Sequence, residues 1–81
     1  MSWPMVPPGA RLLWCLRRRS ANVSCVLYGS TLPIEVRVLQ DRDVVLTEYF
    51  PEERLAEGWA SIYGERLKQQ GWIEAPPEVG V

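Results

Sequence analysis

The two cysteines, Cys15 and Cys25, are the strongest nucleophiles in this 81-residue chain. A cysteine becomes reactive when a neighbouring base or cation lowers the pKa of its thiol, and histidine is the usual base. The chain contains no histidine, and the two cysteines are ten residues apart, which fits no common zinc motif. We therefore expect two small, buried, apolar thiols, with neither a catalytic cysteine nor a metal site.

The carboxylates do not suggest acid–base catalysis either. Glu52, Glu53 and Glu57 lie near the start of a predicted helix, where acidic side chains favour the positive end of the helix dipole. Asp41 and Asp43 flank a predicted turn, where aspartate bonds to nearby backbone. The sequence has no glycine-rich phosphate loop and no serine nucleophile motif. We expect no enzymatic activity, no cofactor and no small-molecule substrate.

Composition indicates a single folded domain. The hydrophobic fraction is 47%, which argues against disorder, and no apolar run is long enough to cross a membrane. Residues 1–9 carry no lysine or arginine and no apolar segment of the kind found in secretory signals. We therefore expect a cytoplasmic protein with reduced thiols.

Four stretches have the alternating apolar pattern or the β-branched and aromatic content of strands. Turn sequences separate these stretches, which cover residues 11–19, 23–28, 34–40 and 44–50. The clearest is 34–40, where Ile34, Val36 and Val38 alternate with Glu35 and Arg37. Short connections between successive strands predict an antiparallel meander of four strands, or of three if the first stretch is not a strand.

Turn length decides which side chains face each other. With a three-residue loop after 11–19, Cys15 lies opposite Cys25; with a two-residue loop the two sulfurs point to opposite faces. A two-residue turn at 41–42 would place Val45 opposite Val38, whereas a longer loop would turn Val44 or Leu46 inward. The sequence leaves both alternatives open.

A helix is predicted after Pro51, which suits a first helical position. Its apolar stripe consists of Leu55, Trp59, Ile62 or Tyr63, and Leu67. Gly71 fits the left-handed position after a helix, and contact between Trp72 and Leu67 is then expected. Gly58 and Gly64 each destabilise a helix interior by about 1 kcal/mol relative to alanine, which suggests close packing at both positions.

The expected fold class is therefore α+β, a small antiparallel sheet with one C-terminal amphipathic helix packed on one face. We expect residues 1–10 to form a proline-rich N-terminal arm, 11–73 the folded domain and 74–81 a proline-rich flexible tail. The other sheet face would meet solvent or a partner.

From Trp14 to Trp72 the pattern resembles that of a group of short bacterial proteins of unassigned function. The resemblance is carried by Trp14-Cys15-Leu16-Arg17, Ser24-Cys25-Val26-Leu27, Glu35-Val36-Arg37-Val38, Tyr49-Phe50 and Gly71-Trp72. It implies the strand–strand–strand–helix fold and a bacterial, cytosolic origin. It implies no activity.

Four tryptophans and three tyrosines exceed what so small a core requires. Large exposed aromatic side chains mark interfaces, where tryptophan, tyrosine and arginine are common anchors. We therefore expect a protein-interaction module that associates with itself through the open sheet face or through its tryptophan-containing ends. The candidate interface residues are Trp3, Trp14, Val26, Tyr28 and Trp72.

The alternative partner is nucleic acid, because basic residues are unevenly distributed. Residues 1–40 carry a net charge of +4 and residues 41–81 a net charge of −5. Arginines at a hairpin tip could contact phosphate, and sheet aromatics could stack on bases. The candidate contacts are Arg17, Arg18, Arg19, Arg37 and Arg42.

Overall fold

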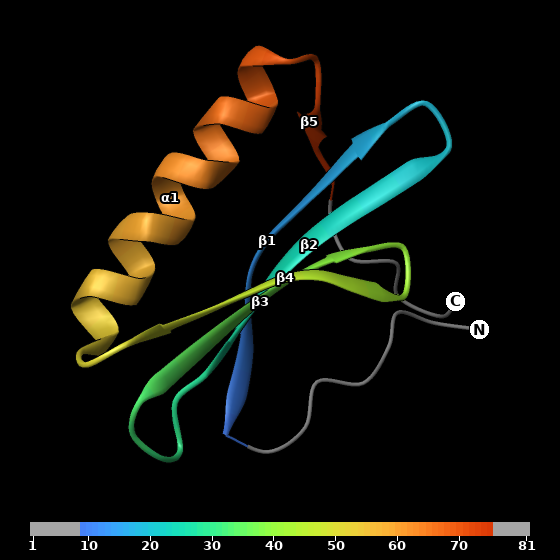
Figure 1. The fold of residues 1–81 in the computed structure, drawn as a ribbon. Helices are drawn as coiled ribbons and strands as arrows, with labels where there is room; N and C mark the ends of the chain where they lie inside the picture. Colours follow the sequence, from blue (N-terminus) through green and yellow to red (C-terminus); the bar gives the residue numbers. More distant parts are fainter. Residues whose placement is uncertain (1–8, 76–81) are drawn as a thin grey trace.

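A computed structural model of the chain describes residues 9–75. They form a five-stranded antiparallel sheet with one helix on one face (Figure 1). The strand order is β4-β3-β2-β1-β5, and the expected α+β meander with a C-terminal helix is confirmed. The elements are β1 (Ala10–Arg18), β2 (Ala21–Tyr28), β3 (Ile34–Gln40), β4 (Asp43–Phe50), α1 (Glu53–Gln69) and β5 (Ile73–Glu74).

The turn between β1 and β2 has two residues, Arg19 and Ser20, and Arg19 adopts a left-handed φ of 57°. Cys15 consequently lies opposite Ser24 and not opposite Cys25. In the same register Trp14 lies opposite Cys25, and a bulge at Leu13 then shifts the register, so that Leu12 lies opposite Val26. The two free thiols therefore belong to opposite faces of the sheet, which is the alternative that excludes a disulfide between them.

The turn between β3 and β4 is also a two-residue turn, because Gln40 is paired with Asp43. Such a turn alone would place Val45 opposite Val38. A bulge at Val45 instead sets Leu46 opposite Val38, and Leu46 packs against the core. The short turn and the inward position of Leu46 therefore occur together, because a bulge adds one residue to β4.

The core lies between the sheet and α1. Six residues of β2 and β3 meet two alanines of the helix there: Val23, Cys25, Leu27, Ile34, Val36, Val38, Ala56 and Ala60. Ala56, Ala60 and Gly64 form the buried face of α1, and their small size brings the helix backbone close to the strands. Because these small residues face the sheet, the buried face of α1 differs from the predicted apolar stripe. Tyr63 packs against the core, whereas Ile62 is 59% exposed and Leu55 is 41% exposed.

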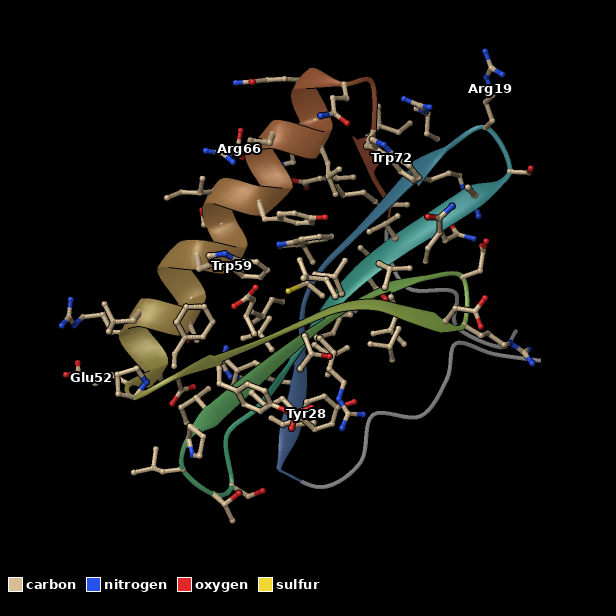
Figure 2. All side chains as sticks on the ribbon, viewed as in Figure 1. Arg19, Tyr28, Glu52, Trp59, Arg66 and Trp72 are labelled. Carbon is tan, nitrogen blue, oxygen red and sulfur yellow. The ribbon has the colours of Figure 1, made fainter. Side chains whose placement is uncertain are left out.

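A row of aromatic rings crosses this interface from β1 to β4. Trp14 stacks on Tyr63 with ring centroids 6.3 Å apart, and Tyr63 stacks on Trp59 at 5.2 Å. Trp59 contacts Phe50 of β4 at 5.8 Å. Figure 2 shows Trp59 between the helix and the strands. The row ties both sides of the sheet to α1, because each ring contributes large apolar area and a favourable stacking geometry.

The helix ends as predicted. Gly71 has a φ of 101°, and its N–H donates to the carbonyl of Lys68 at 3.0 Å. The N–H of Trp72 donates to the carbonyl of Leu67 at 3.1 Å, and both side chains pack against the core. This stop reverses the chain and allows β5 to pair with Leu16 and Arg17 of β1. β5 was not predicted from the sequence. It places Glu74 in the sheet, whereas the sequence placed it in the tail.

We expect opposite effects from adding a methyl group at the two helical glycines. At Gly58 the new Cβ meets nothing within 4 Å, so Gly58→Ala should raise the free energy of unfolding by about 1 kcal/mol. At Gly64 the Cβ would lie 3.0 Å from Nε1 of Trp14 and 3.1 Å from Cε2. Gly64→Ala should therefore lower the free energy of unfolding by about 1–3 kcal/mol. Urea denaturation of both variants measures this, and a stabilised Gly64→Ala would contradict the packing.

The Cys25 thiol is fully buried, and burial raises its pKa to about 12. The unfolded chain loses this proton near pH 9, whereas the folded protein keeps it up to about pH 12. Stability should therefore fall between these values, by up to about 1.4 kcal/mol per pH unit from this thiol. Urea denaturation from pH 8 to 10.5 should show a shallower fall for Cys25→Ala than for the wild type, and identical slopes would contradict the burial.

Candidate interaction surface

The five residues predicted as an interface do not form one surface. Trp3 lies outside the described residues. Trp14 is on the helix side of the sheet, where its indole N–H donates to the carbonyl of Ala60 at 2.8 Å. Val26 and Tyr28 are on the opposite side, but Val26 is only 7% exposed and Tyr28 is half-buried. These positions do not support association through Trp14 and Val26.

Trp72, the fifth of these residues, has a structural partner. The Arg18 guanidinium lies 5.3 Å from the centroid of its ring and donates to the carbonyl of Gln70 at 2.9 Å. The arginine thus binds one of the orphan carbonyls at the end of α1 and covers the half-buried indole. Arg18 and Trp72 together hold the helix end against β1. This contact could not be predicted from the spacing of the two residues in the sequence.

Arg37 is also occupied within the chain. Its guanidinium lies 4.6 Å from the centroid of the Tyr28 ring and donates to the carboxylate of Glu35. Hydrogen bonding to Glu35 is the main cause of the raised pKa of Arg37. The three side chains come from neighbouring positions of β2 and β3 on the face away from α1. A phosphate would have to displace Glu35 to reach this arginine.

Arg17, Arg19 and Arg42 are gathered at one end of the sheet. The two turns meet there, because the Asp41 N–H donates to the carbonyl of Asn22 at 2.7 Å. All three arginines are exposed, and none forms an ion pair within residues 9–75. Figure 2 shows Arg19 at the tip of the β1–β2 hairpin, directed away from the sheet. Of the five predicted nucleic-acid contacts, these three remain accessible.

Three of the four large exposed apolar side chains in the strands belong to β4, and the fourth, Ile73, belongs to β5 at the opposite border. Val44 is 49% exposed, Val45 is 55% exposed and Tyr49 is 60% exposed. We call these residues, together with Thr47, the β4 edge, because among residues 9–75 β4 pairs only with β3 and forms one border of the sheet.

Proteins usually protect such a strand with lysine, proline or a bulge. Asp43–Phe50 contains neither lysine nor proline, and its glutamate, Glu48, is half-buried opposite Val36. The bulge at Val45 lies at the turn end, so Leu46–Phe50 continues as a regular strand. This strand was predicted from the sequence, but its residues were not selected as a site. The predicted topology already indicated an exposed edge here, because the last strand of an open meander has a neighbour on one side only.

The described part of the chain offers little for other chemistry. Residues 9–75 contain no group of three or more cysteine, aspartate or glutamate side chains placed to hold a metal ion. Within the same range, α1 is neither long nor apolar enough to cross a membrane. Comparison with protein-family models, curated proteins and solved structures found no match to this chain. The resemblance to short bacterial proteins therefore stays an expectation.

Proposed function

We propose that this protein is a non-enzymatic interaction module whose copies associate through the β4 edge. The observation that carries the proposal is the exposure of Val44, Val45 and Tyr49 on a strand with an unpaired border. Strand addition gains main-chain hydrogen bonds, and the apolar side chains leave water at the same time. Val44, Thr47 and Tyr49 pair with residues of β3 that face away from α1, so this surface is the border of the open sheet face suggested by the sequence. It does not include the tryptophan-containing ends.

A second copy suits this edge because antiparallel pairing of identical strands is symmetric. Each copy then offers the same surface to the other, as in most dimers. The start of one β4 lies beside the end of its partner in such a pair, so that Arg42 approaches Glu52 of the second copy. These residues flank β4 on either side and carry opposite charges, and both are exposed. Symmetry thus adds two ion pairs to the apolar contact.

Lysine substitutions at the β4 edge test this directly. We expect the wild type to be dimeric at micromolar concentration in sedimentation velocity, and Val45→Lys/Tyr49→Lys to be monomeric, because a charged edge repels its own copy. Both positions are exposed, so the stability of the monomer should change by only about 0.5 kcal/mol.

Ile62→Lys/Ile73→Lys is the matched control, since both residues are similarly exposed, Ile62 on α1 and Ile73 on β5 at the opposite border of the sheet. It should remain dimeric. A wild type that stays monomeric at high micromolar concentration, or a control that dissociates as fully as the edge variant, would refute the proposal.

Nucleic-acid binding is the second candidate, favoured by the grouping of Arg17, Arg19 and Arg42 at the turns. Asp41 and Asp43 lie beside Arg42 and weaken the positive potential there. If the end binds phosphate, labelled RNA or DNA should bind in a salt-dependent manner, and Arg17→Ala/Arg19→Ala/Arg42→Ala should reduce the salt slope by about 0.7–0.9 per lost contact. Absence of binding at low salt would eliminate this candidate.

We also expect the module to act in a bacterial cytoplasm. The reducing environment would keep both thiols free, consistent with their burial on opposite faces of the sheet.

A further inference from the structure

A groove lies between β1 and α1, near the opposite border of the sheet from the β4 edge. Its floor is formed by Leu13 and Trp14, and Gly64 contributes to the helical wall. The volume of the groove is about 340 Å³, and a neighbouring hollow reaches Cys15 and Ala75 along the same strand. The groove therefore follows the outer side of β1.

The strand at the base of this groove is only partly paired on its outer side. β5 covers Leu16 and Arg17, and the Ala75 N–H donates to the carbonyl of Cys15 at 3.0 Å. Among residues 9–75, no strand lies beside Arg11–Trp14 on this side. The next two residues in sequence are prolines, which have no N–H to donate to a ladder. β5 thus shows that this border accepts an extended segment, and within residues 9–75 nothing pairs with the rest of it.

The two ends of the groove are negatively charged. At one end Arg11 is bound by both Glu53 and Glu57. At the other end Lys68 is bound by Glu65 and Glu74, and pairing with Lys68 lowers the pKa of Glu74. Each cation faces two carboxylates, so each end retains an excess negative charge.

The spacing of the two ends suits an extended chain. Glu57 and Glu65 are eight residues apart on α1, which corresponds to about 12 Å along the helix axis. Two side chains four residues apart in a strand point to the same side and are about 13 Å apart. Two basic residues with this spacing would each reach one acidic end.

We propose that the groove binds an extended basic segment of a partner protein, which adds as a strand to Arg11–Trp14 of β1 and directs two cationic side chains at the acidic ends. The side chain midway between the two cations points to the same side of the segment and meets Trp14. This site is separate from the β4 edge and does not rest on self-association.

The probe is a fluorescein-labelled peptide, Gly-Thr-Lys-Thr-Val-Thr-Lys-Thr-Gly, whose binding is followed by fluorescence anisotropy; its valine shares a side with the two lysines. We expect it to bind, and Glu65→Gln/Glu74→Gln to weaken binding about tenfold, because two of the carboxylates are neutralised. Asp43→Asn/Glu48→Gln removes the same charge outside the groove and should leave binding unchanged. Circular dichroism confirms that both variants remain folded.

Two matched peptides separate charge from strand addition. A peptide with glutamate in place of both lysines should not bind, and one with alternate N-methylated amides should bind at least about tenfold more weakly, since it keeps the charge but cannot pair. The proposal would be overturned if either matched peptide bound as tightly as the probe. It would also be overturned if both protein variants lost binding equally, or if the probe did not bind. Dissociation of the dimer by the probe would assign the groove to a second copy and also overturn it.

Discussion

The contact between Trp14 and the helix backbone fixes how the two layers of this protein fit together. The indole lies against Gly64, where an added Cβ would be only 3.0 Å from its Nε1, and donates its N–H to the carbonyl of Ala60. This arrangement anchors α1 over β1, places the other aromatic rings beneath the helix and leaves β4 as the far border of the sheet. Trp14 is therefore part of the core, and the surfaces left for partners lie along the borders of the sheet.

Local features were predictable because they depend on neighbouring residues. The four strands follow from alternation and β-branched content, and the helix stop follows from Gly71 with Trp72 and Leu67. The face on which Trp14 lies depends on the two-residue turn, which places it opposite Cys25, and the sequence left the length of that turn open. The bulge at Leu13 was not predicted either, and it puts Leu12 on the other face. Long-range partners such as Arg18 with Gln70 were equally inaccessible, because 52 residues separate them.

The candidate sites, like the fold, were only partly predictable from the sequence. Sequence indicated that aromatic and arginine residues were in excess, but the fold uses Trp14, Trp72, Arg18 and Arg37 for its own contacts. Three surfaces remain as candidate contact sites: the β4 edge, the arginines at the turns and the acidic groove beside β1. Each is a surface suited to contact with another molecule, and the β4 edge is the most apolar of them.

The central proposal is that copies meet along β4, and a dilution series of ¹⁵N-labelled protein followed by NMR tests it without any substitution. The amide signals of Leu46–Phe50 should move together as concentration rises, whereas those around Gly58 and Ile62 on the outer helix face should stay fixed. Signals that do not depend on concentration, or changes confined to α1 or to the Arg19–Ser20 turn, would contradict the account.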